Sequence, residues 1–252
     1  MELFDLSSHV GVVTGGNGGI GLGLARGLAK SGAQVAIWAR NEAKNADAVA
    51  VLEALGTTAI GLSCDVTHPA DVEAAIAATL DRFGRVDSMF VNAGTTGSGR
   101  FDTFELDEFE RVLQVNVTGA FLCMQMAVRH MLERGGGGSI IAVASVAATK
   151  GLRYSPHYSA SKGGIRQLAR ALSTEVGRKG INVNVISPGF VRSEMTEPMA
   201  NEAFEEILKT RVPLRRWGEP ADFERVAAFL AAETGGFMSG TEIIVDGGLH
   251  AF

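Results

Sequence analysis

A tyrosine and a lysine stand four residues apart, as Tyr158 and Lys162, with only small residues between them. On an α-helix this spacing returns two side chains to nearly the same face, roughly 6 Å apart along the axis. A phenol with a pKa of about 10 releases its proton reluctantly near neutral pH. A neighbouring ammonium is expected to lower that pKa and to prepare the phenol for proton transfer. The pair on its own is equally compatible with two idle surface residues.

A glycine-rich run, TGGNGGIG from Thr14 to Gly21, is a second candidate for chemistry. Glycines let the backbone turn tightly and approach a ligand, while the following helix directs its N-terminus at that ligand. This arrangement suits a pyrophosphate. The spacing of Gly15, Gly19 and Gly21 differs from the common G-x-G-x-x-G, but the position after a first strand favours a dinucleotide over a merely mobile turn.

The end of the second predicted strand should carry the residue that reads the adenosine ribose. An acidic residue there would select NAD, and the segment AIWARN at 36–41 contains none. Arg40 follows the strand directly, and a guanidinium can pair with a 2′-phosphate, so NADP(H) is favoured as the cofactor. Asn17 occupies the glycine run where a second basic residue would strengthen this preference, so NAD(H) is the alternative.

The scaffold for these residues follows from short β-branched stretches that alternate with longer helical patterns. Strands are predicted at residues 10–14, 35–38, 59–63, 86–91, 139–144, 181–186 and 242–245. Helices are predicted at residues 20–30, 41–55, 69–83, 106–133, 156–179, 202–208 and 220–233. Seven apolar strands that alternate with helices imply an α/β fold, a doubly wound parallel sheet with helices on both faces. The glycines at 135–138 indicate a turn rather than a linker, so residues 1–252 are expected to form a single domain.

The amino-acid composition argues against several classes of partner and site. The chain has 252 residues, of which 46% are hydrophobic and 20% charged, as in a soluble globular protein. A net charge of −5 without a basic block argues against nucleic acid as a partner. The acidic N-terminus and the lack of a long apolar run argue against a signal peptide or membrane span, and favour a cytoplasmic location. Cys64 and Cys123 lie in apolar stretches and the five histidines are scattered, so buried free thiols and no metal site are expected.

Together the motifs resemble the short-chain dehydrogenase/reductase family from end to end. Their order is TGGNGGIG at 14–21, CDV at 64–66, NAG at 92–94, NVTG at 116–119, Ser145, YSASK at 158–162, PG at 188–189, PLRRWGEP at 213–220 and VDGG at 245–248. Each motif is short, but the order and the 13 residues from Ser145 to Tyr158 are specific. The resemblance implies a Rossmann-type fold and hydride transfer between a nicotinamide and a secondary alcohol or ketone.

The resemblance also implies roles for individual residues. Tyr158 would exchange a proton with the substrate oxygen, while Lys162 would support the phenolate and bind the nicotinamide ribose. Ser145 would donate a hydrogen bond to the same oxygen. Asn116 would hold a water that links Lys162 to solvent, or else simply satisfy a helix backbone. His157 adjoins Tyr158 but would point about 100° away on a helix, so it is given no catalytic role.

The cofactor-binding set that the resemblance implies is drawn from the glycine run, the ends of the following strands and the segment after Pro188. It comprises Gly15, Asn17, Gly18, Gly19, Ile20, Gly21, Arg40, Asn41, Asp65, Val66, Asn92, Ala93, Gly94, Tyr158, Lys162, Pro188, Gly189, Val191 and Ser193.

A small carbonyl or alcohol substrate is expected among the loops 95–101 and 146–157 and a lid near 190–214. Arg153 and Tyr154 could meet an anionic or hydroxylated substrate, or lie in solvent. The resemblance suggests 3-oxoacyl thioesters, sugars and sugar acids or cyclic ketones, and a homotetramer formed by the helices at 106–133 and 156–179 with the C-terminal tail. The alternatives are a catalytically inactive dinucleotide-binding regulatory or scaffold protein, and a dehydratase or epimerase on the same fold.

Overall fold

A seven-stranded parallel sheet forms the centre of the computed structural model, which describes residues 4–232 and 236–251. The strands are β1 (Val10–Thr14), β2 (Gln34–Trp38), β3 (Ala59–Leu62), β4 (Ser88–Val91), β5 (Gly138–Val143), β6 (Ile181–Pro188) and β7 (Glu242–Val245). Their order across the sheet is β3-β2-β1-β4-β5-β6-β7. All seven strands lie where the sequence predicted them, and the predicted fold class is confirmed.

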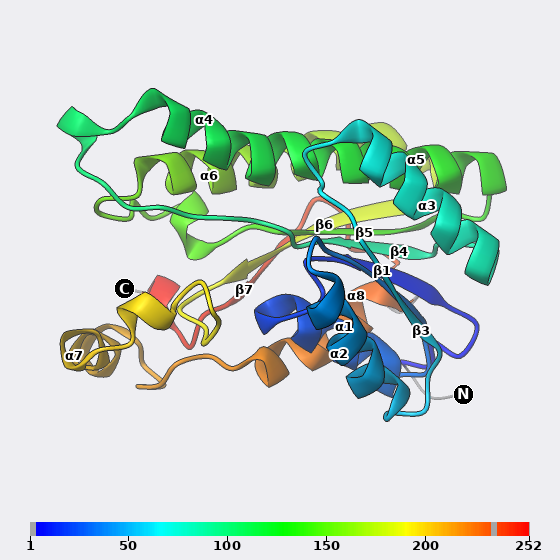
Figure 1. Cartoon of the computed structure of the whole chain (residues 1–252), viewed down its shortest axis with the longest axis horizontal. Coiled ribbons are helices and arrows are strands. Elements are labelled where there is room, and N and C mark those ends of the chain that lie inside the picture. The colour runs from blue at the N-terminus through cyan, green and yellow to red at the C-terminus, as the bar shows by residue number, and fades with distance from the viewer. Residues whose placement is uncertain (1–3, 233–235, 252) are drawn as a thin grey trace.

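Helices cover both faces of the sheet (Figure 1). One layer contains α3 (Pro69–Phe83), α4 (Leu106–Leu113), α5 (Gly119–Arg134) and α6 (Pro156–Val176). The other contains α1 (Gly19–Lys30), α2 (Glu42–Glu53) and α8 (Glu224–Ala231). Helix α7 (Glu202–Arg211) lies beside these layers, near the C-terminus (Figure 1). None of the helices within the described residues is long and apolar enough to cross a membrane.

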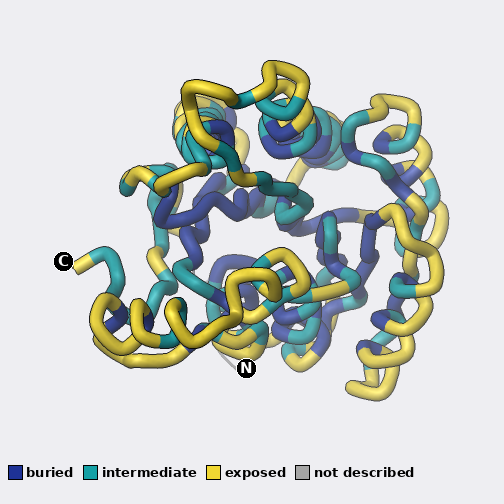
Figure 2. The backbone as a smooth tube through the Cα atoms, turned by 60° about the vertical axis from the view of Figure 1, so that its left-hand side comes forward, coloured by how far each residue is buried: buried dark blue, intermediate teal, exposed yellow. Residues whose placement is uncertain are grey.

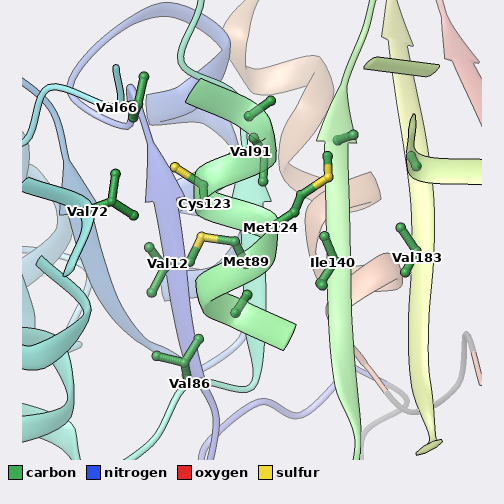
Figure 3. Close-up of a cluster of buried hydrophobic side chains, with 14 of the residues drawn as sticks. Val12, Val66, Val72, Val86, Met89, Val91, Cys123, Met124, Ile140 and Val183 are labelled. Atoms are coloured by element: carbon green, nitrogen blue, oxygen red, sulfur yellow. The ribbon is translucent and has the colours of Figure 1, made fainter. Parts of the chain in front are cut away.

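Two apolar cores flank the sheet, because parallel strands bury both of their faces. Figure 2 shows the strands as buried, with the exposed backbone on helices and loops around them. The core under α3, α5 and α6 includes Val12, Met89, Cys123, Met124 and Ile140 (Figure 3). The core under α1 and α8 includes Val13, Leu24, Leu28, Phe90 and Phe223. Cys64 and Cys123 are buried and free, as predicted, and burial raises the pKa of Cys64 to about 12.

Glycines allow helix α1 to lie directly against the C-terminal part of the chain. A Cβ atom added to Gly23 would stand 2.0 Å from the Pro220 carbonyl oxygen, and one added to Gly27 would stand 2.1 Å from the Glu224 carbonyl oxygen. Only glycine permits so close a backbone approach. The packing of α1 on this segment sets the direction in which the N-terminus of α1 points.

The predicted helix at 106–133 is wrong in one respect. A π-helical turn at Gln114–Thr118 divides it into α4 and α5, and the Gly119 amide donates to the Gln114 carbonyl. Such turns are often found at functional sites. The predicted helix at 220–233 begins with a 3₁₀ turn at Pro220–Phe223 and continues as α8, while residue 233 lies outside the described residues.

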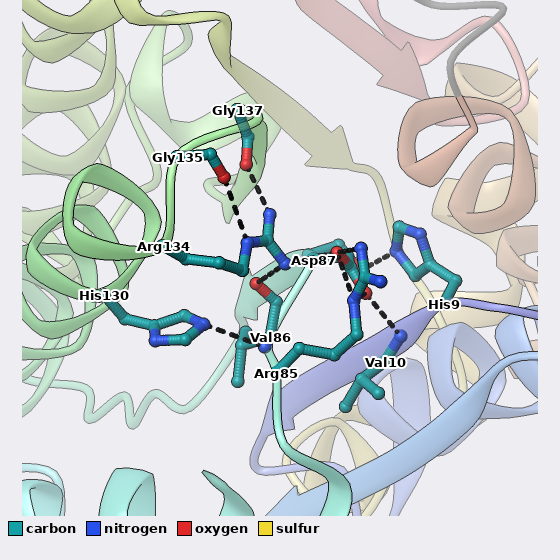
Figure 4. A network of polar contacts seen from close by, with 10 residues as sticks. His9, Val10, Arg85, Val86, Asp87, His130, Arg134, Gly135 and Gly137 are labelled. Carbon is teal, nitrogen blue, oxygen red and sulfur yellow. Dashed lines mark hydrogen bonds and ion pairs between the residues drawn. The ribbon is translucent and has the colours of Figure 1, made fainter.

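A cluster of charges joins the amino ends of β1, β4 and β5 (Figure 4). The Asp87 carboxylate accepts hydrogen bonds from the Val10 amide at 2.9 Å and from the Arg85 and Arg134 guanidinium groups. Burial opposes ionisation, but these bonds hold the pKa of Asp87 below its usual value. The cluster fastens this edge of the sheet, opposite the edge at which the predicted site residues gather.

Candidate active site

The predicted site residues converge at the carboxyl edge of the sheet. Thr14 ends β1, Asn92 follows β4, Ser145 lies two residues after β5 and Pro188 ends β6. The chain leaves β1 for β2 on one side, while β4 pairs with β1 on the other. In open α/β sheets, ligands bind in the crevice outside such a reversal of strand order.

The glycine run forms a tight turn that leads into α1. Gly15 and Gly19 have positive φ angles of 62° and 48°. A Cβ atom added to Gly21 would stand 2.1 Å from the Gly15 carbonyl oxygen. Helix α1 begins without a side-chain cap at Gly18 and without an acidic residue in its first turn, so its first amides, near Ile20, stay available to an anion. This cradle fits the pyrophosphate of a dinucleotide.

A clamp between β1 and β4 holds the glycine turn in place. The Asn92 side-chain amide donates to the carbonyls of Thr14 at 3.0 Å and Gly15 at 3.2 Å. The Thr14 hydroxyl in turn accepts from the Asn92 and Ala93 amides, both at 2.9 Å. Asn92 and Thr14 therefore tie β1 to β4 where the glycine turn begins. Thr14 was not predicted as part of this support, although it opens the glycine motif.

Arg40 is the cation at the end of β2. Its side chain is 78% exposed and its Nη1 lies 3.9 Å from the Asp65 carboxylate. Burial opposes ionisation of Asp65, but hydrogen bonds from Thr67 and the charge of Arg40 hold its pKa below the usual value. Asn41 caps α2 by accepting from the Lys44 amide, and Val66 packs in the core beside Asp65. Arg40 and Asp65 thus place an exposed guanidinium and an ionised carboxylate just beyond the carboxyl ends of β2 and β3.

Asn17 lies on the turn, but its side chain is engaged within the protein. Its amide donates to the Asn45 side chain at 2.7 Å, and Asn45 is anchored to the Ala39 and Leu62 carbonyls. Gly18, beside it, has an extended backbone and no atom within 4 Å of an added Cβ. A ligand at this turn would meet the backbone of Asn17 rather than its amide.

The segment after β6 runs over the glycine turn. The Gly189 amide donates to the Val245 carbonyl, and Val191 forms an isolated parallel bridge to Gly218. A Cβ atom added to Gly19 would stand 3.0 Å from the Ser193 Cβ, so Ser193 lies against the cradle. The Ser193 amide donates to the Thr196 hydroxyl, which steadies the start of the predicted lid.

Lys162 projects from α6 into the interior. Only 4% of the residue is exposed, and its Nζ donates to the Val143 carbonyl at 2.9 Å. It lies 5.6 Å from the centroid of the Tyr158 ring, so the two side chains share a helix face as predicted. Burial lowers the pKa of Lys162 to about 8. The ammonium form therefore still predominates at neutral pH.

The expected effect of Lys162 on the acidity of Tyr158 is wrong for the protein alone. Burial raises the pKa of the phenol, and a hydrogen bond with Ser145 offsets this only in part. The reason is desolvation, which disfavours the phenolate. Ser145 lies at the N-cap of a 3₁₀ turn, where its hydroxyl accepts from the Ala147 amide. Tyr158 thus stays protonated near neutral pH, with Ser145 beside its hydroxyl.

Asn116 lies in the π-helical turn and is fully buried. Its side chain accepts from the Thr95 amide at 2.7 Å and donates to the Thr95 carbonyl and the Ser161 hydroxyl, both at 2.9 Å. A Cβ atom added to Gly94 would stand 3.2 Å from Asn116 Oδ1 and 3.5 Å from Lys162 Nζ. Asn116 therefore ties the loop after β4 to the helix of Lys162. Ser161 was missed as a partner, although it lies inside the YSASK motif.

A cavity of about 480 Å³ opens between the loop after β4 and the segment before α6. It is lined by Gly99, Arg100, Phe101, Asp102, Leu152, Arg153, Tyr154 and Pro156. The Gly99 amide donates to the Tyr154 carbonyl at 2.9 Å, which joins the two segments. Arg153 lies over the Tyr154 ring, 4.6 Å from its centroid. In the described residues no group of histidine, cysteine or acidic side chains could hold a metal.

Comparisons with known proteins agree with this geometry. A family model described as enoyl-(acyl carrier protein) reductase matches residues 15–250. L-rhamnose 1-dehydrogenase (NAD(P)+) of Sphingomonas sp. strain SKA58 is 36% identical, with 95% of each chain covered. The 3-oxoacyl-(acyl carrier protein) reductase of Chlamydia pneumoniae is 35% identical, with 94% of this chain and 95% of that protein covered. A crystal structure of a short-chain type dehydrogenase/reductase from Mycobacterium marinum superposes with a TM-score of 0.94 at 34% identity, covering 98% of both chains.

Proposed function

The chain belongs to the short-chain dehydrogenase/reductase family, and from this we propose how its site works as an NAD(P)-dependent oxidoreductase on a secondary alcohol or ketone. One observation carries the proposal. Tyr158, Lys162 and Ser145 meet at the carboxyl edge of the sheet, beside the glycine cradle that fits a pyrophosphate. The relatives compared above are oxidoreductases, so neither the inactive scaffold nor the dehydratase or epimerase is carried further.

Proton transfer in this site is the task of Tyr158. A bound nicotinamide supplies the hydride to the carbonyl carbon in the reductive direction. Tyr158 gives its phenolic proton to the carbonyl oxygen, and Lys162 stabilises the phenolate that remains. Ser145 donates a hydrogen bond to the same oxygen while negative charge develops there. In alcohol oxidation the phenolate accepts the proton instead.

Proton supply to Lys162 would pass through Asn116. Because its side chain is occupied by Thr95 and Ser161, a water that links Lys162 to solvent would bind the Asn116 backbone carbonyl. The π-helical turn that contains Asn116 supports this assignment, since it departs from the regular pattern of helix bonds at that place.

NADP(H) is the favoured cofactor, with NAD(H) as the alternative. The glycine turn would hold the pyrophosphate and Arg40 the 2′-phosphate, because its guanidinium is exposed beside the crevice. Asp65 and Val66 would flank the adenine, and Ala93 and Gly94 would lie beside the cofactor next to Asn92. Around the nicotinamide half would lie Pro188, Gly189, Val191 and Ser193, together with Lys162 on its ribose.

The substrate would enter over two segments, the loop at residues 95–101, named here the substrate loop, and the lid at 190–214. Relatives named for a sugar and for 3-oxoacyl thioesters support substrates of these two classes. Cyclic ketones are the third class that the family resemblance suggests. Arg153 and Tyr154 line the cavity beside the substrate loop and could contact a hydroxyl or anionic group.

We further propose a cytoplasmic homotetramer. Phe121 and Leu132 on α5 and Leu106 on α4 are large apolar side chains that are exposed in the single chain. A second copy that packs on these helices would cover them.

Spectroscopic screening tests the function. Sugars, sugar acids, 3-oxoacyl thioesters and cyclic ketones are incubated with NADPH or NADH, and the alcohols with the oxidised cofactors, while nicotinamide absorbance is followed. Turnover of at least one substrate is expected. Tight NADPH binding without oxidation by any carbonyl would contradict the proposal.

A further inference from the structure

His157 is a buried imidazole that the proposed reaction does not use. The residue is fully buried, and within the described residues neither ring nitrogen has a hydrogen-bond partner of good geometry, although the Gly97 backbone lies close enough to favour a proton on the ring. An unpaired buried polar group costs about 1–3 kcal/mol, and a phenylalanine would fill a similar space without this cost. Shape alone therefore does not explain a titratable ring at this position.

The ring packs between helix α6 and the substrate loop. It stacks on Phe104 with ring centroids 4.5 Å apart and planes at 29°. A Cβ atom added to Gly97 would stand 3.1 Å from His157 Nε2 and 2.3 Å from Glu108 Oε1, so both groups converge on the Gly97 backbone. Ser155 donates to the Gly97 carbonyl at 3.3 Å. His157 thus supports the middle of the substrate loop, one residue before Tyr158.

Glu108 connects this support to the start of the same loop. Its carboxylate accepts from Arg111 Nε at 2.7 Å and from Nη2 at 2.8 Å. The same guanidinium donates to the Thr95 hydroxyl and the Thr96 carbonyl, both at 3.1 Å. The first residues of the substrate loop therefore depend on where Glu108 holds Arg111.

The charged groups that face the ring are Glu108 and Arg111, both on α4, while Gly97 and Ser155 bring uncharged polar atoms. Burial holds the pKa of His157 below its usual value and Arg111 acts in the same direction, although Glu108 and the Gly97 backbone oppose them. The ring is neutral at neutral pH. A protonated ring would be a buried cation whose facing carboxylate is already paired with Arg111.

We propose that His157 is a positioning residue that keeps the substrate loop in its binding shape only while its ring is neutral. Protonation draws Glu108 away from Arg111 or drives the ring toward solvent, and either movement releases the Thr95 hydroxyl and the Thr96 carbonyl from Arg111. The consequence for catalysis is a KM that rises at acid pH, and this part rests on the proposed function. The movement of the loop does not depend on that function.

Hydrogen exchange of the unmodified chain measures the loop directly. Mass spectrometry of peptides that cover residues 95–101 is compared at about pH 7.5 and about pH 5.5, after correction for intrinsic exchange rates. Protection of the wild-type loop should fall by up to about tenfold for each pH unit below 6.5, the pKa of an exposed ring, until the lower pKa of the packed ring is reached. His157→Phe, which keeps an aromatic ring against Phe104 but cannot protonate, should show no such fall. His68→Phe, at an exposed histidine, should respond as the wild type does.

Two results would overturn the inference: a wild-type loop whose protection does not change with pH, or an equal acid response in His157→Phe. If His157→Phe does not fold, the test uses two measurements on the wild type, hydrogen exchange of the loop and NMR titration of the His157 ring. The fall in protection must then end near the pH at which the His157 ring titrates by NMR, and a separation of more than about one pH unit contradicts the inference.

Steady-state kinetics distinguishes a failure of the His157 proposal from a failure of the proposed oxidoreductase function. On any substrate found by screening, KM should rise with acidity in the wild type and stay level in His157→Phe, while kcat follows the same pH profile in both. An unchanged KM profile in the wild type contradicts the inference even if turnover is robust. If no substrate is turned over, the proposed function fails, and the exchange experiment still decides the role of His157.

Discussion

Tyr158 and Lys162 respond in opposite ways to the same buried surroundings. Burial raises the pKa of the phenol and lowers that of the amine to about 8. The phenol therefore keeps its proton at neutral pH, and in the proposed reaction it gives this proton to the substrate oxygen. The remaining phenolate would then lie near a cation in a region of low dielectric, where their attraction is strong.

Cofactor selection is predicted to depend on one side chain. Arg40→Ala should weaken NADPH binding about 10- to 100-fold, since a hydrogen bond to a charged group contributes about 1.5–3 kcal/mol. NADH binding should change little, because NADH lacks the 2′-phosphate. Titration of nicotinamide fluorescence measures both dissociation constants, with Arg178→Ala as an exposed arginine control. Equal losses of affinity for NADPH and NADH would contradict a role of Arg40 in binding the 2′-phosphate.

Residues inside motifs were predictable, while their partners often were not. Asn116 and Ser145 were proposed from the family resemblance that the short motifs carry. The burial of His157 and the pairing of Asn17 with Asn45 arise from contacts between segments far apart in sequence. The acidity of Tyr158 was predicted in the wrong direction because helical spacing places an ammonium nearby but says nothing about desolvation.

At the level of elements, the strands were predictable because buried parallel strands are nearly continuous apolar runs. The division of the helix at 106–133 was not, because the residues from Gln114 to Thr118 continue a helical pattern. The π-helical turn accompanies contacts of Asn116 with Thr95 and Ser161, which no local pattern records.

Helix α1 is predicted to tolerate no side chain where it meets the C-terminal segment. Gly27→Ala should lower the free energy of unfolding by about 1–3 kcal/mol, because the new methyl group would overlap the Glu224 carbonyl. Gly163→Ala is the matched control in α6, where the nearest atom to an added Cβ is 3.8 Å away. It should stabilise the helix by up to about 1 kcal/mol. Denaturant unfolding compares the two, and equal effects would contradict the close approach of α1.

On the scale of the whole molecule, the two edges of the sheet have different tasks. The carboxyl edge carries the glycine cradle and Tyr158, while the amino edge is fastened by Asp87 and its two arginines (Figure 4). His9 belongs to the amino edge, where its Nε2 lies 3.0 Å from the Ser88 hydroxyl. Substitutions at the amino edge can therefore change the free energy of unfolding without changing the residues of the candidate active site.

Acid sensitivity of the fold is predicted to arise partly at His9. Burial lowers its pKa from 6.5 to about 4, with Asp87 opposing the shift. Between these values the unfolded chain binds a proton that the folded chain does not, so stability is full above pH 6.5 and falls toward pH 4. His9→Gln should flatten this fall in denaturant titrations across the interval, whereas His68→Gln should not. A His9→Gln profile as steep as that of the wild type would be the contrary result.

In the proposed reaction the Tyr158 hydroxyl moves the proton that accompanies hydride transfer. The most direct measurement is the rate of nicotinamide absorbance change in Tyr158→Phe, at a cofactor concentration that saturates both proteins. Turnover is expected to fall roughly 10²- to 10⁴-fold, with NADPH still bound. Turnover at the wild-type rate in a variant that lacks this hydroxyl would contradict this role of Tyr158.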